Sequence, residues 1–405
     1  MAKKYTSIVG VDIGSQTIKV AEVKLAGKQP TVTALGMAMT PEGAVDHVGV
    51  HDPVAVGAVL KQVCAQAGAN VGDAIVSLSG QGSVVVRTLE VPVMSDSELK
   101  QHMEWEITRN IPFAESDVVS DFAAFPANGA QNMDVVMAIA TQSTVNTVRD
   151  ILKRAGKKPA ALDVQPLGLA RSLRTSYEGE LGNKRVCIVD IGHKSSSINI
   201  FNDGKLVMPR QVPIGGEMFT RAVADGLAIP FAEAEAMKHA KGRIPEAAGQ
   251  APAFNPFGDT GFATQQFQPY NPFADAEEAA APGAEAAPPA PEPAAPAAPA
   301  PTGMDADETK LWNAMAPVAD EFVSEVRRSI DYFRSKGGDV DTVMLCGGGA
   351  RLRGIAEFIQ SVIGVPTSLF DPTKGLPVTA KHAEDLEQEK QEFAVAIGNG
   401  LHIAF

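Results

Sequence analysis

The chain has 405 residues, of which 45% are hydrophobic and 20% charged, and this balance is typical of a globular protein with a sizeable core. The formal net charge of −13 argues against a nucleic-acid-binding surface. No apolar run approaches the ~18 residues of a membrane-spanning helix, no signal peptide is expected, and the distant Cys64, Cys187 and Cys346 fit free thiols. We therefore expect a cytoplasmic protein of two or three domains.

Short β runs alternate with helical runs through the first half of the chain, which predicts an α/β protein. Ser95 and Glu98 form a capping box that predicts a helix start, and Pro112 marks where that helix has ended. Strands are expected over 7–12, 18–24, 74–78, 84–91 and 134–141. Helices are expected over 52–67, 95–110 and 144–155.

The second half follows the same alternation but contains one segment of different composition. Strands are expected over 184–190, 196–202 and 342–345, and a long helix over 307–336. Between 251 and 301 lie 12 of the 28 prolines, six carboxylates and neither Lys nor Arg. Such a segment cannot bury enough apolar surface to fold, so we predict a disordered acidic Pro/Ala-rich insert.

The expected domain organisation follows from these elements. It consists of a first lobe core (1–84), an extra subdomain (85–162), an interlobe connection (163–183), the first part of a second lobe (184–250), the insert (251–303) and the completion of the second lobe (304–405). Within the insert, FNPFGD over 254–259 recurs as YNPFAD over 270–275. The repeat is either a local duplication or a pair of low-affinity docking peptides.

An Asp-x-Gly turn occurs twice, as VDIGSQT over 11–17 and as VDIGHKS over 189–195. Backbone N–H groups in a glycine turn cradle an anion, and an Asp at a strand end can hold hydrated Mg2+. The two turns are therefore predicted to grip a polyphosphate and its metal through Asp12 and Asp190, with Lys19 directed at a phosphate. The alternative is that both turns merely close hairpins.

A third glycine-rich turn follows the strand expected over 342–345. Gly347, Gly348 and Gly349 precede a helix expected to run through Ile359, and such a turn lets a flat ligand lie on backbone near a helix N-terminus. The pattern matches neither a Walker motif nor the dinucleotide fingerprint. Taken alone, the triplet is equally well explained as a packing turn.

The three turns together resemble the actin-like ATPase class, which includes actin, sugar kinases and heat-shock chaperones. The resemblance implies a two-lobed α/β fold of duplicated ribonuclease-H-like lobes, with ATP and Mg2+ bound between them. AVAIGNG over 394–400 resembles the second helix that connects the lobes. The nucleotide contacts implied are Asp12, Gly14, Ser15, Thr17, Lys19, Asp190, Gly192, Ser195, Ser196, Gly215, Gly216, Glu235, Lys238, Gly347, Gly348, Gly349 and Arg351.

Three further segments, EWEI over 104–107, NIPF over 110–113 and LDVQPL over 162–167, resemble the type IV pilus assembly PilM family. The resemblance covers about 1–245 and 305–405 and implies that the extra subdomain is α+β. It implies a cytoplasmic scaffold held at the inner membrane through a partner and without inserting into the membrane itself. That partner is the N-terminal cytoplasmic tail of a PilN-like single-span pilus protein, with other motor-platform proteins as further candidates.

The sequence departs from the pattern of the actin-like class in two segments. Gln165 stands where many relatives carry the Glu that orients the attacking water, so it is the candidate catalytic residue and hydrolysis is expected to be slow. His193 and Lys194 replace small residues after the second Asp-x-Gly. Their bulk either crowds the terminal phosphate or, through Lys194, pairs with it.

Three other functions remain open at the level of sequence. An FtsA-like cell-division scaffold carries an amphipathic C-terminal membrane helix, and 401–405 is too short for one. A small-molecule kinase on the same fold needs an Asp base, for which no motif is evident. A purely structural protein without nucleotide is disfavoured by the presence of Asp12, Lys19 and Asp190.

Overall fold

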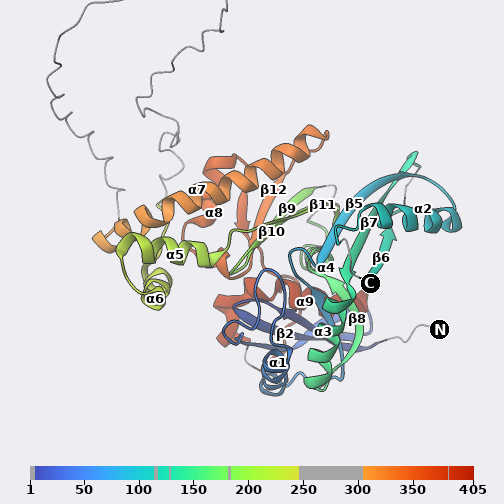
Figure 1. Ribbon diagram of the computed structural model, residues 1–405, viewed down its shortest axis with the longest axis horizontal. Helices are drawn as coiled ribbons and strands as arrows, with labels where there is room; N and C mark the ends of the chain where they lie inside the picture. The colour runs from blue at the N-terminus through green and yellow to red at the C-terminus, as the bar shows by residue number, and fades with distance from the viewer. Residues whose placement is uncertain (1–4, 114–116, 127–128, 181–183, 246–303, 382) are drawn as a thin grey trace, which may run out of the picture.

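Figure 1 shows the computed structural model, which describes residues 5–113, 117–126, 129–180, 184–245, 304–381 and 383–405. The predicted insert over 251–303 and its repeated motif lie outside the described residues. Within the described ranges, every helix is too short or too polar to span a bilayer. The described chain forms two lobes, each built on a five-stranded sheet, and a smaller three-stranded sheet beside them.

The first lobe is a sheet of order β3-β2-β1-β4-β8. β1 pairs antiparallel with β2, which pairs antiparallel with β3, while β4 and β8 run parallel to β1. The apolar sides of α1 and α3 pack in one hydrophobic core with this sheet. The elements are β1 (Ser7–Ile13), β2 (Thr17–Ala26), β3 (Gln29–Met39), α1 (Pro53–Ala67), β4 (Asp73–Leu78), α3 (Gln142–Arg154) and β8 (Lys158–Val164).

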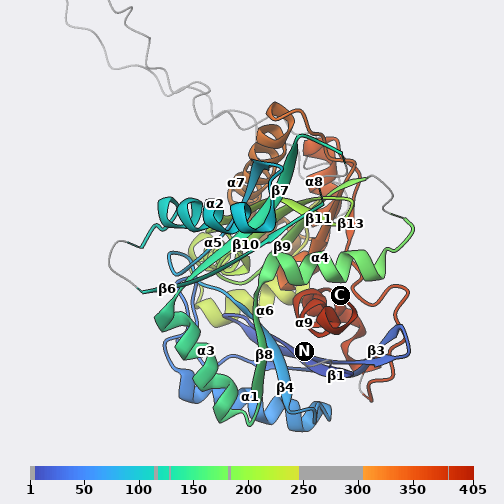
Figure 2. The same cartoon turned by 90° about the vertical axis from the view of Figure 1, so that its right-hand side faces the viewer.

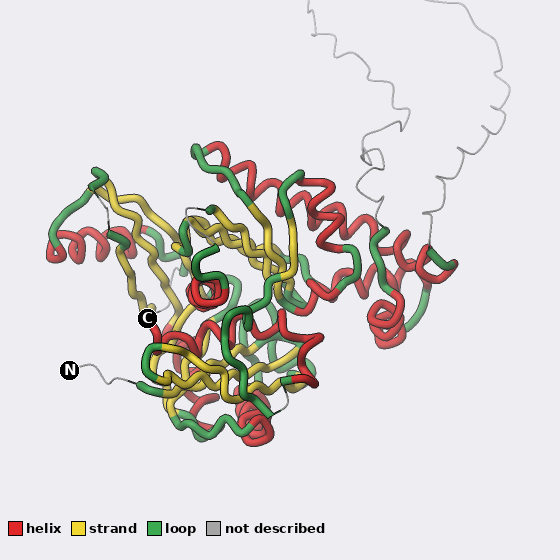
Figure 3. The backbone as a smooth tube through the Cα atoms, turned by 180° about the vertical axis from the view of Figure 1, so that it is seen from behind, coloured by secondary structure: helices red, strands yellow, loops and turns green. Residues whose placement is uncertain are grey.

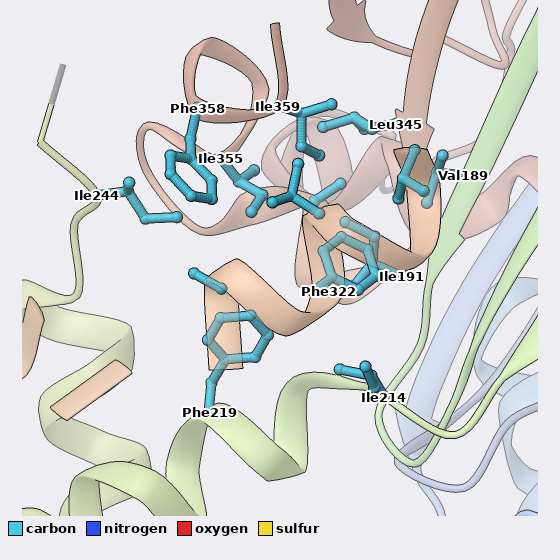
Figure 4. Packing of buried hydrophobic residues seen from close by; sticks show 14 of the residues in the cluster. Val189, Ile191, Ile214, Phe219, Ile244, Phe322, Leu345, Ile355, Phe358 and Ile359 are labelled. Carbon is cyan, nitrogen blue, oxygen red and sulfur yellow. The ribbon is translucent and has the colours of Figure 1, made fainter. Parts of the chain in front are cut away.

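The second lobe repeats this topology with the order β11-β10-β9-β12-β13. Three antiparallel strands are again followed by two parallel ones, so the two lobes are a structural duplication. Figure 4 shows the core of this lobe, where Phe219, Phe322 and Phe358 pack beside the aliphatic side chains of β9 and β12. The elements are β9 (Arg185–Ile191), β10 (Ser196–Asn202), β11 (Lys205–Val212), α5 (Gly216–Leu227), α6 (Phe231–Lys241), α7 (Ala306–Ser335), β12 (Thr342–Cys346), α8 (Ile355–Ile363) and β13 (Thr367–Leu369).

The small sheet has the order β5-β7-β6 and carries α2 on one face. Its elements are β5 (Val84–Pro92), α2 (Asp96–Arg109), β6 (Val118–Ala124) and β7 (Asn132–Thr141). Leu99 and Met103 of α2 are buried against the sheet, and Figure 3 shows the helix at the periphery of the molecule. This is the extra α+β subdomain, but it is shorter than the predicted 85–162. The later part of that range, α3 and β8, belongs to the first lobe because β8 pairs with β4.

Two helices connect the lobes, α4 (Gln165–Ser176) and α9 (Ala394–Gly400), and Figure 2 shows them side by side between the two large sheets. Their crossing is very close, because a Cβ added to Gly398 would lie 1.9 Å from the carbonyl oxygen of Gly168. Asn399, which is fully buried, donates to the carbonyl of Val11 at 2.9 Å and accepts from the Ser77 hydroxyl at 3.0 Å. The helix α9 is therefore tied directly to the strand that carries the first Asp-x-Gly turn.

Candidate functional site

A cavity of about 830 Å³ lies between the lobes and is lined by residues of both. Asp12 and Asp190, which were predicted to face one another, both line it. So do Gln165 and the three glycines of the triplet, together with most of the other predicted nucleotide contacts. Of the predicted residues, Gly215 and Ser196 do not line the cavity. Ser196 is buried and donates its hydroxyl to the Ile214 carbonyl at 2.6 Å.

The two Asp-x-Gly turns have matching backbone geometry. The Gly14 N–H donates to the Thr17 carbonyl at 3.0 Å, and the Gly192 N–H donates to the Ser195 carbonyl at 3.1 Å. A Cβ on either glycine would come within 2.8 Å of that same carbonyl oxygen, so each turn requires glycine. Both turns do close hairpins, as the alternative interpretation holds, yet they also present their backbone to a shared cavity.

Lys19 and Asp12 form a pair at the first turn. They lie opposite each other in the β1–β2 hairpin, and the Lys19 ammonium is 3.2 Å from the Asp12 carboxylate. Burial opposes the charge of Lys19, but the carboxylates of Asp12, Glu392 and Asp190 outweigh burial and raise the pKa of the ammonium group. Lys19 is therefore a fixed cation at the cavity wall, where a phosphate can approach it.

Asp190 lies in an environment that disfavours ionisation of its carboxyl. Burial raises the pKa of its carboxyl to about 6, and the nearby Asp12 charge adds to this rise, while Lys19 and a hydrogen bond from Gln165 oppose it. The Gln165 amide donates to Asp190 at 2.5 Å from the first turn of α4. The charges of Asp12 and Asp190 repel each other, and a divalent cation bound beside them would relieve that repulsion.

We expect Asp190→Asn to stabilise the nucleotide-free protein at pH 7.5. Because the folded-state pKa of about 6 lies above the ordinary value of 3.8, the stability contributed by this carboxyl is complete below pH 4 and is lost as the pH rises through 6. Asp190 is only partly buried and lines the cavity, so the gain at pH 7.5 should be about 1–2 kcal/mol, less than the full shift implies. Urea unfolding without nucleotide at pH 4 and pH 7.5 measures it.

Asp150→Asn is the matched control for this experiment, because Asp150 is exposed on α3 and pairs with Arg154 at the surface. It should show no gain at pH 7.5. If Asp190→Asn instead lost the same stability at both pH values, the ionised Asp190 carboxylate would not destabilise the folded protein.

A second polar network lies at the side of the cavity formed by α5 and α6. The Lys238 ammonium donates to the Gly216 carbonyl at 3.1 Å, to the Thr220 hydroxyl at 2.6 Å and to Glu235 at 2.8 Å. Burial opposes ionisation of Glu235, but hydrogen bonds from His239, Lys238 and Thr220 hold the pKa of its carboxyl well below the usual range. The network gives the cavity an ionised carboxylate and an ammonium group fixed side by side.

The two bulky residues after the second Asp-x-Gly have different environments. The Lys194 ammonium pairs with Glu217 at 2.8 Å, and Glu217 also pairs with Arg221 at 3.2 Å. Burial lowers the pKa of the His193 imidazole, which lines the cavity beside them. In this structure Lys194 is therefore directed at a carboxylate of α5.

The glycine triplet adopts a different local structure from the predicted strand-to-helix turn. Gly347 has φ 78°, the next residues form a 3₁₀ turn (η2, Gly348–Arg351), and α8 begins only at Ile355. The prediction of a helix running directly from the triplet is wrong, because Gly354 takes a left-handed conformation that starts a separate helix. A Cβ on Gly347 would lie 2.2 Å from the Asp190 carboxylate, so the triplet packs directly against the second turn.

Sequence reasoning missed the segment η3 (Glu384–Phe393), which leads into α9 and closes one wall of the cavity. The Gln391 carbonyl accepts from the Gly347 N–H at 3.1 Å, and Glu392 is nearly buried among predicted nucleotide contacts. Their place in the sequence could have indicated this role, because both residues immediately precede the expected connecting helix over 394–400.

The carboxylates of the cavity fit a hydrated Mg2+ better than a fully chelated metal. In the part of the chain that the structure describes, no three His, Cys, Asp or Glu side chains gather closely enough to hold a metal ion among themselves. Mg2+ usually retains several waters and takes one or two carboxylates together with substrate phosphates. Asp12 and Asp190, which face one cavity, meet that requirement.

Comparison with known families finds two matching models. The model described as type IV pilus assembly protein PilM matches residues 10–264, which is more than half of the chain. The model described as cell division protein FtsA matches residues 187–398, which form mainly the second lobe.

Among solved structures, one described as the PilM-PilN type IV pilus biogenesis complex superposes with a TM-score of 0.74 at 24% identity and covers 100% of both chains. The ethanolamine utilization protein EutJ from Carboxydothermus hydrogenoformans superposes with a TM-score of 0.50 at 14% identity, covering 99% of this chain and 91% of that one. The first of these confirms the two-lobed fold with its extra subdomain.

Curated relatives include FtsA of Neisseria meningitidis, 27% identical over 180 residues, and FtsA of Escherichia coli K12, 25% identical over 258 residues. The alignments cover 41% and 57% of this chain. They cover 42% and 59% of the two relatives, so the chain spans less than two thirds of either.

Proposed function

Because the chain belongs to the type IV pilus assembly protein PilM family, we propose that it is an ATP-binding scaffold of the pilus assembly machinery in the cytoplasm. Its partner would be the N-terminal cytoplasmic tail of a PilN-like inner-membrane protein, which would hold it at that membrane. The observation that carries the proposal is the pair of matching Asp-x-Gly turns on one cavity, in a chain whose fold matches a solved PilM-PilN complex over its full length.

The nucleotide would be held from both lobes. The turns at Gly14 and Gly192 offer backbone N–H groups and hydroxyls to the phosphates, Lys19 adds a fixed positive charge, and the glycine triplet offers a surface for adenosine. Bound Mg2+ would neutralise phosphate charge between Asp12 and Asp190. The neutral Gln165 amide can orient a water but is a poor proton acceptor, which favours slow hydrolysis and a role as a nucleotide-responsive scaffold.

Closure of the lobes would connect the nucleotide to the partner surface. Turning a 1:99 ratio of closed to open forms into 99:1 requires ~10⁴-fold preference of ATP for the closed form, and contacts from both lobes are the means of providing it. The extra sheet contacts the second lobe, since the Thr88 hydroxyl on β5 donates to the Val207 carbonyl on β11 at 2.8 Å. A movement of the second lobe would therefore reach the extra subdomain.

Asp12→Ala is expected to weaken binding of Mg-ATP by at least about 100-fold, because it removes a proposed metal carboxylate and leaves Lys19 without its partner. Isothermal titration of ATP with Mg2+ measures this effect, with Asp150→Ala on the surface of α3 as the control. Titration of a synthetic N-terminal tail of a PilN-like protein, with and without ATP, then measures the coupling.

The wild-type protein should bind the tail with an affinity that changes at least threefold on addition of ATP, and Asp12→Ala should lose this change. Equal tail affinity in both conditions would remove the nucleotide-responsive part of the proposal and leave a constitutive scaffold. Absence of tail binding in every condition would contradict the scaffold itself.

An FtsA-like scaffold is the second candidate, supported by the match of the FtsA model to residues 187–398. That match covers mainly the second lobe and leaves out the extra subdomain. Filaments that sediment with ATP and lipid vesicles in the absence of any pilus protein would favour this alternative.

A further inference from the structure

Glu392 joins the two lobes inside the cavity. The Thr17 hydroxyl, at the start of β2 in the first lobe, donates to Glu392 Oε2 at 3.3 Å. Arg351, at the end of η2 in the second lobe, contacts Glu392 Oε1 at 3.2 Å. The Glu392 side chain is only 8% exposed, so this carboxylate has little access to water and is stabilised by these two partners and by the nearby Lys19 ammonium.

Both partners are groups suited to an anion, and both line the cavity. An arginine guanidinium and a hydroxyl beside a glycine turn are common ligands of phosphate. Here they contact a carboxylate of the chain itself. Glu392 also brings a third negative charge to a cavity that already contains Asp12 and Asp190, one more than hydrated Mg2+ requires.

We propose that Glu392 is an affinity-determining residue that occupies Thr17 and Arg351 in place of phosphate and holds the nucleotide-free lobes together. An incoming polyphosphate must displace the carboxylate from both groups and overcome its charge. This inference rests on the proposed ATP site but concerns a residue outside the predicted contacts. Glu392 therefore makes nucleotide binding weaker than it would be without this carboxylate. ATP binds only as the Thr17–Glu392–Arg351 bridge is released.

Glu389 provides a matched control for this bridge. It pairs with the same Arg351 guanidinium at 3.3 Å, yet it does not line the cavity and has no described hydrogen bond to the first lobe. Glu389→Gln and Glu392→Gln therefore change the net charge equally and disturb the same arginine. Only Glu392→Gln removes one of the negative charges within the cavity and weakens the connection between the lobes.

The experiment is titration of Mg-ATP and of inorganic triphosphate into the wild-type protein and both variants, together with thermal unfolding of each without nucleotide. Glu392→Gln should bind both ligands about tenfold more tightly than wild type, because one like charge near the phosphates is gone. It should also unfold at a lower temperature than Glu389→Gln. Glu389→Gln should bind both ligands within twofold of wild type.

The outcomes separate this inference from the proposed function. Unchanged or weaker ATP binding by Glu392→Gln, in a wild-type protein that binds ATP, overturns the inference and leaves the ATP site intact; weaker binding would identify Glu392 as a direct ligand. Absence of ATP and triphosphate binding in the wild type and in Glu392→Gln overturns both. Tighter binding of triphosphate as well as ATP places the competition at the phosphates, as proposed.

Discussion

Gly398→Ala is expected to lower the free energy of unfolding by at least about 3 kcal/mol, although Gly398 does not itself line the cavity. The added Cβ would lie 1.9 Å from the Gly168 carbonyl oxygen and 2.5 Å from its carbonyl carbon. Both obstructing atoms are backbone atoms of α4, so no side chain can rotate aside. The two connecting helices would have to separate, and the lobes with them.

Urea unfolding of the full chain measures this effect, and Gly72→Ala is the control. A Cβ on Gly72 meets nothing within 4 Å, so that variant should stay within about 0.5 kcal/mol of wild type. A variant at Gly398 that unfolds within 1 kcal/mol of wild type would mean that α4 and α9 do not cross as closely as described.

The crossing of α4 and α9 also bears on the cavity. Asn399 follows Gly398 and bonds to Val11, the residue before Asp12. A rotation of α9 relative to β1 would therefore move the first Asp-x-Gly turn. If the lobes move, the small residues at the crossing and the buried Asn399 amide would transmit that movement to the first Asp-x-Gly turn, which would give the proposed nucleotide response a physical basis.

The sequence predicted the elements whose signals are local. The capping box at Ser95 is present, with the helix from Asp96 to Arg109. The paired hairpins around Asp12 and Asp190 were predicted because each contains an apolar strand, a glycine turn and a second strand within a short window. Local patterns of this kind determine the backbone before tertiary packing contributes.

Two of the elements that were missed, β8 and β13, depend on distant partners. β8 contains Pro159 and two alanines, which give it little intrinsic strand preference, and it forms because β4 provides a parallel neighbour. β13 has only three residues and is defined by its pairing with β12. The positions of such strands are determined by the neighbouring strands of the sheet and not by the residue pattern of the strands themselves.

The same reason explains which part of the site could be predicted. Asp12, Lys19 and Asp190 lie in local motifs that the sequence displays. Glu392 is 375 residues away from Thr17, and the chain must complete both lobes before the two meet. No local pattern in 384–393 indicates that its last residues return to the cavity.

Gly347→Ala and Gly348→Ala are expected to separate the structural role of the glycine triplet from its ligand role. At Gly347, φ is 78°, and a Cβ would lie 2.2 Å from an Asp190 carboxylate oxygen and 2.6 Å from the Ile191 carbonyl oxygen. Gly347→Ala should therefore displace the second Asp-x-Gly turn, lower the free energy of unfolding by about 2–3 kcal/mol and weaken Mg-ATP binding by more than about 100-fold.

Gly348→Ala differs because its Cβ would meet only the Glu392 carboxylate, at 3.5 Å, which is an ordinary contact. This variant should unfold within about 0.5 kcal/mol of wild type, yet bind Mg-ATP about tenfold more weakly, since the new methyl group occupies cavity surface offered to adenosine. Inorganic triphosphate, which lacks adenosine, should bind Gly348→Ala as it binds wild type. If Gly348→Ala bound ATP and triphosphate with equal losses, an adenosine site on the triplet would be contradicted. The methyl group at Gly348 should obstruct the adenosine and leave the phosphates free to bind.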